Sequence, residues 1–328
     1  MSKRKREYNE YLPVVFANAM IPNPGIDLYD NIGNCYEHCI KHRGLMQQYG
    51  LSNTKDDCKN LSRTLFTLRD WIRTKQAYKI TKELADDLFS MDDLTFPADC
   101  LRLPYRTIFM DFSDLNIPAQ GTQLEDKGYI IYGVFMTLGD VAYYDKIATM
   151  CGFVTLIAPK SQIATTTELS YGGLAFDYDN TDDGQTLQDK IKQLTKTFQG
   201  PKESIIKALL FAAYLSSEQP DIEENETQKT FYRPIEKLKT SSVRKWDVGI
   251  RYTKEVARYK SSNTPRVSTG IGASKRPHIR KAHWHIYRIG KGRTQKKVIW
   301  LPPIEVNCRN QETLPVVVRT VEKGENDV

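Results

Sequence analysis

The sequence has no long apolar run, few cysteines and few histidines. No stretch of about 18 consecutive apolar residues occurs, which argues against a transmembrane helix. The basic first residues lead into Glu7 and not into an apolar core, so we expect no secretory signal, no membrane partner and a cytoplasmic location. The six cysteines are dispersed along the 328 residues, which is typical of reduced thiols and not of a disulfide framework.

The sequence also lacks complete metal motifs, internal repeats, coiled-coil heptads and a convincing helix-turn-helix. Cys35, His38, Cys39 and His42 lie on one predicted helix, where four ligands cannot easily close a tetrahedron around zinc. The acidic stretch after Tyr171 lacks the glutamate that completes a calcium loop. We therefore expect neither a metal nor a cofactor.

The charge is divided unevenly along the chain. Residues 233–300 hold 19 lysines and arginines against 3 acidic residues, whereas residues 1–232 hold 25 against 32. A basic segment joined to an acidic body indicates a polyanionic partner for one end, and nucleic acid or the ribosome is the first candidate. In the alternative, the basic segment docks on the protein's own acidic body.

The order of the predicted elements indicates an α+β fold in three regions. Residues 1–103 are expected to be mainly helical, and residues 104–222 to form an antiparallel β-meander with helices. Residues 223–328 form a basic region with one helix and a β-hairpin. Apolar periodicity predicts helices over residues 32–49, 58–78, 81–90, 186–198, 203–216 and 246–260. Alternating β-branched and aromatic residues predict strands over 106–112, 128–137, 140–147 and 151–157.

Two polar segments interrupt this pattern. Residues 171–183 place aspartates after a glycine pair, and we expect a solvated loop there. Asp111 and Asp114 follow the first strand of the meander and are candidates for a carboxylate pair in metal or acid–base chemistry. Strand ends commonly carry such residues for structural reasons, which is the simpler interpretation.

The stretch from Ser274 to Arg288 holds three of the five histidines together with arginine, lysine and tryptophan. Residues 282–289 are expected to form a strand, because aromatic and β-branched residues dominate them. Alternation then places His283, His285 and Tyr287 on one face of the strand and Trp284, Ile286 and Arg288 on the other. A turn over residues 291–294 leads to a second predicted strand, 297–301.

Three chemical interpretations of this stretch compete. His278, His283 and His285 could bind a metal, but the surrounding lysines and arginines disfavour a divalent cation. The same histidines could act as general acid and base in metal-independent RNA cleavage, with Arg280 or Lys281 holding the phosphate. In the third, the cluster binds an anion or a peptide, or orders the hairpin. The candidates for nucleic-acid or anion binding are Lys275, Arg276, His278, Arg280, Lys281, His283, His285, Arg288, Lys291 and Arg293.

The same residues resemble the C-terminal signature of the second-described type V-A anti-CRISPR family. The resemblance is carried by Lys275-Arg-Pro-His-Ile-Arg-Lys-Ala-His-Trp-His285, by Val298-Ile-Trp300 and by Val306-Asn307, with Pro277, Trp284, Tyr287 and Trp300 as signature residues. Weaker agreement covers residues 62–87, 108–113, 209–222 and 248–260, whereas 115–200 aligns poorly. Ala282 stands where the family pattern has glycine, and Arg288 where it has tryptophan.

This resemblance implies a protein of a phage, plasmid or other mobile element that acts in a bacterial host cell. Such a protein blocks production of the type V-A RNA-guided effector nuclease. It recognises the effector's N-terminal polypeptide during translation and causes loss of its mRNA. The expected partners are that nascent peptide, the ribosome or mRNA, and a host ribonuclease. The body would then hold the peptide and the basic region the RNA, so deleting residues 233–328 should separate the two activities. The alternatives are a ribonuclease that uses the histidine cluster, and a nucleic-acid-binding regulator of a mobile element.

Overall fold

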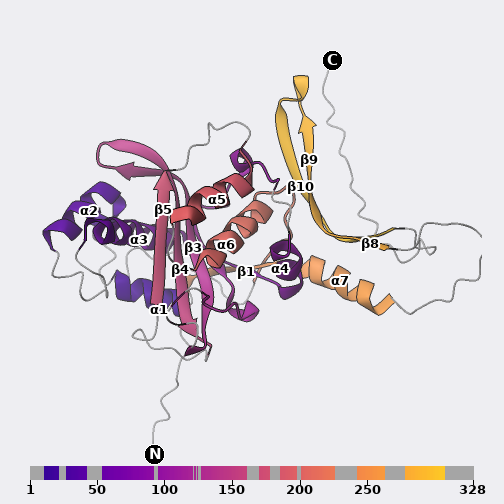
Figure 1. Cartoon of the computed structure of the whole chain (residues 1–328), viewed down its shortest axis with the longest axis horizontal. Coiled ribbons are helices and arrows are strands. Elements are labelled where there is room, and N and C mark those ends of the chain that lie inside the picture. The colour runs from indigo at the N-terminus through magenta and orange to yellow at the C-terminus, as the bar shows by residue number, and fades with distance from the viewer. Residues whose placement is uncertain are drawn as a thin grey trace, which may run out of the picture.

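A seven-stranded mixed sheet forms the centre of the protein. The computed structural model describes residues 11–21, 27–42, 54–91, 95–120, 122, 124, 127–160, 170–177, 185–197, 201–225, 242–262 and 278–306. The strands lie in the order β5-β4-β3-β2-β1-β7-β6 (Figure 1). Their bounds are β1 Gln76–Ile80, β2 Thr107–Asp111, β3 Tyr129–Tyr143, β4 Lys146–Pro159, β5 Ser170–Asp177, β6 Ile222–Glu224 and β7 Arg244–Val248.

The sheet combines the predicted meander with a parallel part. Strands β2, β3, β4 and β5 pair antiparallel in sequence order, which confirms the meander. Strand β1 pairs parallel with both β2 and β7, and β6 adds to β7 antiparallel. Strands from all three regions that the sequence defines thus hydrogen-bond within one sheet.

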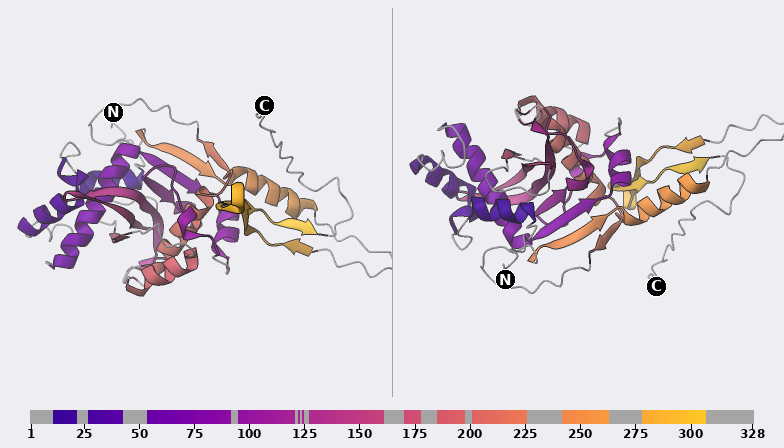
Figure 2. Two further views of the ribbon diagram at one scale, coloured as in Figure 1. Left: turned by 90° about the horizontal axis from the view of Figure 1, so that it is seen from above. Right: turned by 90° about the horizontal axis from the view of Figure 1, so that it is seen from below.

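Helices cover both faces of this sheet, which confirms the α+β class. One face carries α1 (Leu12–Met20), α2 (Ile32–Lys41) and α3 (Lys55–Thr74), and the other carries α4 (Lys82–Phe89), α5 (Leu187–Thr197) and α6 (Lys202–Leu215) (Figures 1 and 2). Along β2, Phe109 packs with the first group, and Ile108 and Met110 with the second. No helix within the described ranges combines the length and the apolar composition needed to cross a bilayer.

The helix predicted over 58–78 is wrong at its end. Helix α3 stops at Thr74, where Lys75 adopts the left-handed conformation with φ of 54°, and β1 begins at Gln76. Both faces of β1 are covered, so its residues lack the polar–apolar alternation that marks a half-exposed strand.

The helix predicted over 246–260 begins too early. Residues 244–248 are strand β7, and the helix is α7, Ile250–Ser262. Gly249 separates them with φ of +93°, in a conformation that L side chains rarely adopt. A Cβ atom there would lie 2.5 Å from Thr81 Oγ1 and 2.8 Å from Leu84 Cδ2, so glycine lets the start of α7 approach α4 closely.

The meander strands are longer than the sequence indicated. The break between the predicted strands 128–137 and 140–147 is wrong, because β3 runs through Gly139 and the chain reverses at Tyr144, which has φ of 53°. The predicted helix 32–49 ends at Lys41, and residues 43–53 lie outside the described part. The loop expected over 171–183 is wrong for residues 171–177, which belong to β5 and pair along β4.

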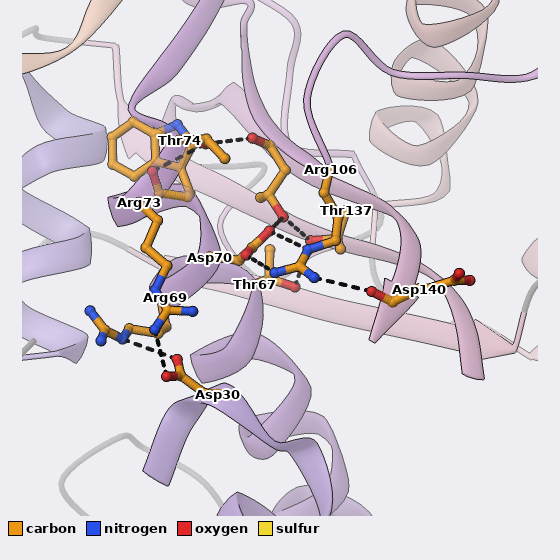
Figure 3. A network of polar contacts seen from close by, with 11 residues as sticks. Asp30, Thr67, Arg69, Asp70, Arg73, Thr74, Arg106, Thr137 and Asp140 are labelled. Atoms are coloured by element: carbon orange, nitrogen blue, oxygen red, sulfur yellow. Dashed lines mark hydrogen bonds and ion pairs between the residues drawn. The ribbon is translucent and has the colours of Figure 1, made fainter. Parts of the chain in front are cut away.

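A buried polar network joins α3 to the meander (Figure 3). The Asp70 carboxylate accepts hydrogen bonds from the Arg106 guanidinium and from the Thr107 hydroxyl, the latter at 2.6 Å. Thr107 Oγ1 lies 2.9 Å from the Thr137 hydroxyl, and Arg106 also donates to the Asp140 carbonyl at 3.1 Å. This network fixes the register between helix and sheet, and it contains no residue of the C-terminal signature.

Candidate functional site

The C-terminal signature folds into a two-stranded arm. Strand β9, His283–Ile289, pairs antiparallel with β10, Gln295–Leu301, from His283 opposite Leu301 to Ile289 opposite Gln295. The turn between them contains Gly290 and Gly292, both with positive φ, and confirms the predicted hairpin. Figure 1 shows the arm standing beside the sheet and outside it. Next to the arm, β8 (His278–Arg280) pairs with β11 (Ile304–Val306).

Two tryptophans anchor the base of the arm. Trp284 and Trp300 are each 8% exposed, and their ring centroids lie 4.7 Å apart. Trp284 also packs edge-on against Phe96 at 5.2 Å, and Trp300 against Tyr214 at 6.2 Å. These signature residues therefore hold the arm against the hydrophobic core, where Trp300 contacts α6 through Tyr214.

Two ion pairs hold the arm from opposite faces. Lys296 Nζ lies 2.9 Å from Asp99 Oδ2, and Lys297 Nζ lies 3.2 Å from Glu218 Oε2. The Glu218 backbone N–H also donates to the Val298 carbonyl at 2.9 Å. Part of the basic region therefore docks on the protein's own acidic body, as the alternative interpretation of the charge predicted.

The distal half of the arm is basic and partly apolar. Ile286, Tyr287 and Ile289 are 37%, 41% and 41% exposed, and they are three of the six exposed large hydrophobic residues in the described part of the chain. The exposed cations beside them are Arg288, Lys291 and Arg293. None of these three forms an ion pair with a carboxylate of the described residues. Cationic side chains interleaved with an exposed aromatic ring suit a nucleic-acid backbone and its bases.

The histidines do not converge on a common point in the described part. His283 Nδ1 lies 3.0 Å from the Lys281 carbonyl oxygen, whereas the His285 ring packs against Tyr287 at 4.2 Å. His278 is paired in β8, and its side chain lies outside the described part, as do Lys275, Arg276 and Pro277. Arg280 and Lys281 are exposed near the base of the arm. Within the described ranges no group of three potential ligands can hold a metal ion.

Three buried polar atoms at the base have no hydrogen-bond partner within the described structure. They are His283 Nε2, Trp284 Nε1 and Trp300 Nε1, and all belong to signature residues. Buried polar groups are normally hydrogen-bonded, because leaving one unpaired costs about 1–3 kcal/mol. The base of the arm therefore retains unused hydrogen-bonding capacity behind the basic surface.

A second polar region lies on the sheet itself. Asp111 and Asp114, weighed from the sequence as a carboxylate pair, line a crevice together with Lys79 and Asp247. Lys79 and Asp247 were not predicted as site residues, because parts of their strands, residues 76–78 and 246–248, were assigned to helices. Neither run, 76–80 nor 244–248, alternates strictly between polar and apolar residues, so the sequence offered little signal for these two strands.

Together, these observations define a mixed α+β protein with a helix-covered sheet and a basic hairpin arm that packs on its core. A family model described as the anti-CRISPR type V subtype A2 family, AcrVA2-like, matches residues 78–308, which include the crevice residues named above and the whole arm. The chain belongs to this family, which confirms the resemblance and supports an anti-CRISPR function.

Two individual proteins are similar over most of their length. Protein FinQ of Escherichia coli is 24% identical over 302 residues, which cover 86% of this chain and 86% of FinQ. The crystal structure of AcrVA2 superposes with a TM-score of 0.53 at 16% identity, covering 91% of this chain and 100% of that chain. The structural match shows a shared fold.

Proposed function

We propose that this protein lowers production of a type V-A RNA-guided effector nuclease. It recognises the effector's N-terminal polypeptide as the ribosome makes it, in the cytoplasm of the bacterial host, and the effector's mRNA is then lost. Family membership supports the target. The separation of a covered, acidic body from an exposed basic arm supports a division of labour between peptide and RNA.

The arm is the part that we assign to ribosomal or messenger RNA. The observation that carries this assignment is the pairing pattern of its basic residues. Lys296 and Lys297 are neutralised by the body, whereas Arg288, Lys291 and Arg293 extend beyond it. No acidic residue occurs between positions 281 and 304, so the distal arm presents a positive field over its whole length.

The alternative function, RNA cleavage by the histidine cluster, is less compatible with the geometry. A general acid or base must reach the proton that it transfers. The Nε2 atom of His283 is buried, and its Nδ1 atom faces the Lys281 carbonyl, so neither nitrogen of this ring is open to a phosphodiester. We infer that a host ribonuclease performs the cleavage.

Purified protein incubated with labelled effector mRNA in the absence of ribosomes separates these two functions. The proposed function predicts intact RNA with the wild type and with the His283→Ala and His285→Ala variants. RNA that is cut by the wild type and spared by these variants would establish the enzyme and remove the need for a host ribonuclease.

The division of labour needs point variants, because deleting residues 233–328 would remove β7. That strand pairs with β1 over the full length of both, so its loss would disrupt the sheet and cannot be expected to spare peptide binding. The triple variant Arg288→Gln, Lys291→Gln, Arg293→Gln changes the distal arm alone.

In cells that express the effector, the triple arm variant should fail to lower effector mRNA while still binding the effector's N-terminal peptide in a pull-down. The matched control replaces three exposed lysines of β3 and β4 or their flanks by glutamine, namely Lys127, Lys146 and Lys160. If both activities fall together in the arm variant and persist in the control, the division of labour is refuted.

A further inference from the structure

The crevice that contains Asp111 lies where three parallel strands end. It has a volume of about 600 Å³ and opens at the carboxyl ends of β1, β2 and β7, on the face of the sheet that α1 covers elsewhere. Ligands of sheets with parallel strands bind beyond the carboxyl ends of the strands. The volume falls within the range of about 300–1,000 Å³ that is typical of ligand pockets.

A transverse row of charged residues crosses the sheet, and its members Asp247, Lys79 and Asp111 line the crevice floor. Glu223 of β6 stands opposite Asp247 of β7, Asp247 opposite Lys79 of β1, and Lys79 opposite Asp111 of β2. Residues opposite one another on adjacent strands point to the same face of the sheet, about 4.8 Å apart from strand to strand. The floor therefore places a carboxylate on each side of a single lysine.

Lys79 forms its ion pair with Asp114, so the two carboxylates on either side of it, Asp111 and Asp247, accept hydrogen bonds from neutral donors. Lys79 Nζ lies 2.7 Å from Asp114 Oδ2. Asp111 accepts hydrogen bonds from the Tyr11 hydroxyl at 2.7 Å and from the Ser113 hydroxyl at 2.6 Å. Asp247 Oδ2 accepts one from Asn225 at 2.9 Å. Neutral donors stabilise a carboxylate but do not cancel its charge.

The pKa values of side chains in the crevice indicate a negative electrostatic potential there. Burial alone would lower the pKa of Lys79, but the hydrogen bond to Asp114 and the charges of Asp111, Asp114 and Asp247 raise it. Burial raises the pKa of Tyr132, and the charge of Asp111 adds to the rise. Four carboxylates and three ammonium groups line the crevice, so it stays negative with its own lysines in place.

The crevice already shows two ways of holding an ammonium group. Asp114 holds that of Lys79 by a direct ion pair, and the Tyr11 ring lies beneath that of Lys245, with Nζ 4.3 Å from the ring centroid. Aliphatic side chains, including Leu12, Ile80 and Ile250, line the same space and can cover the stem of a long basic side chain.

We propose that this crevice binds a basic side chain or the α-amino group of an extended polypeptide, with Asp247 as the principal carboxylate. The inference rests on the proposed function, because it names where the body holds the nascent chain and which chemical group is recognised there. It predicts a preference for peptide segments that carry lysine or arginine.

Two blocked tripeptides test the crevice without effector or ribosome. Acetyl-Ala-Lys-Ala-amide and acetyl-Ala-norleucine-Ala-amide have side chains of similar apolar bulk, and only the first is cationic. Titrated into the isotope-labelled full chain, the lysine peptide should shift the backbone amide signals of Lys79, Asp111 and Asp247, and the norleucine peptide should not. Equal shifts with both peptides, or shifts confined to other elements, would overturn the inference.

Variants then identify the carboxylate. Asp247→Asn should weaken binding of the lysine peptide on the order of tenfold, because a charged hydrogen bond is replaced by a neutral one. Glu224→Gln is the matched control, since Glu224 lies opposite Trp246 on the other face of the same strand pair and should leave binding unchanged. Asp114→Asn, at an exposed position, provides a second variant; it frees Lys79 to neutralise Asp111 and Asp247 and should also weaken binding.

The two proposals fail in different ways. If the lysine peptide does not bind but effector mRNA is still lost in cells, the crevice inference is wrong and the proposed function stands. Unchanged mRNA loss in Asp247→Asn cells, with lysine-peptide binding abolished, would overturn the assignment of the nascent chain to the crevice. If mRNA loss and lysine-peptide binding both fall in Asp247→Asn, the two proposals are supported together.

Discussion

Removing the three distal cations of the arm should reduce the salt dependence of RNA binding by a calculable amount. The variant is the triple glutamine substitution of Arg288, Lys291 and Arg293, which keeps long polar side chains on the same backbone. Each phosphate that a protein neutralises on a single strand contributes about 0.7 to the slope of log affinity against log salt. Three contacts therefore contribute a slope of about 2.

The assay is fluorescence anisotropy with a labelled single-stranded RNA copy of the effector's first codons. Between about 50 and about 200 mM salt, the wild type should lose about 20-fold more affinity than the variant. The control with Lys127, Lys146 and Lys160 replaced has the same change in net charge and should keep the wild-type slope. Equal slopes for the arm variant and the wild type would refute the arm as the RNA-contacting surface.

Three further predictions concern the scaffold, each measured as a free energy of unfolding. Asp70→Asn should lower the free energy of unfolding in urea by about 2–3 kcal/mol, because a buried carboxylate loses charged hydrogen bonds. The control Asp56→Asn, in an exposed ion pair, should change it by no more than about 0.5 kcal/mol. Equal losses in the two variants would contradict the role of the network. Gly249→Ala should cost at least about 2 kcal/mol, since strain and a clash combine, and Gly128→Ala, strained but in open space, about 1 kcal/mol. Burial raises the pKa of Tyr214 to about 12, above the usual value of 10.0. As pH rises, this tyrosine therefore ionises in the unfolded chain before it ionises in the folded protein. The stability that it contributes is complete below pH 10 and is lost as pH rises to 12. The stability gap between wild type and Tyr214→Phe should therefore shrink by about 2–3 kcal/mol across that window, and a constant gap would contradict this assignment.

Local sequence patterns predicted the arm because its two strands and their turn lie close together in the sequence. The alternation of residues 283–288 separates Trp284, which is buried, from His283 and His285, and the hairpin turn lies within the same short stretch. The prediction was less accurate at Ile286, which shares a face with Trp284 but extends beyond the body and is exposed. Alternation defines the face of a strand and not how far the partner surface extends.

The crevice could not be predicted in the same way, because it depends on long-range pairing. Lys79 and Asp247 are 168 positions apart in sequence and become neighbours only when β7 pairs parallel with β1. Parallel strands have no hairpin signal to identify them, and their covered faces weaken the alternation. Asp111 and Asp114 carried a visible cue, as carboxylates at a strand end, whereas Asp247 lay within a predicted helix and Lys79 in the short gap between two predicted helices.

The proposed function depends on recognition of a peptide and not of an RNA sequence, and a comparison of three reporter genes tests this directly. Effector mRNA is measured in cells with and without the protein, using three reporter genes. The first carries the natural opening codons, the second synonymous codons for the same peptide, and the third a frameshift that keeps nearly all nucleotides but encodes another peptide. Peptide recognition predicts loss of the first two transcripts and survival of the third. Loss of the frameshifted transcript together with survival of the synonymous one would contradict it.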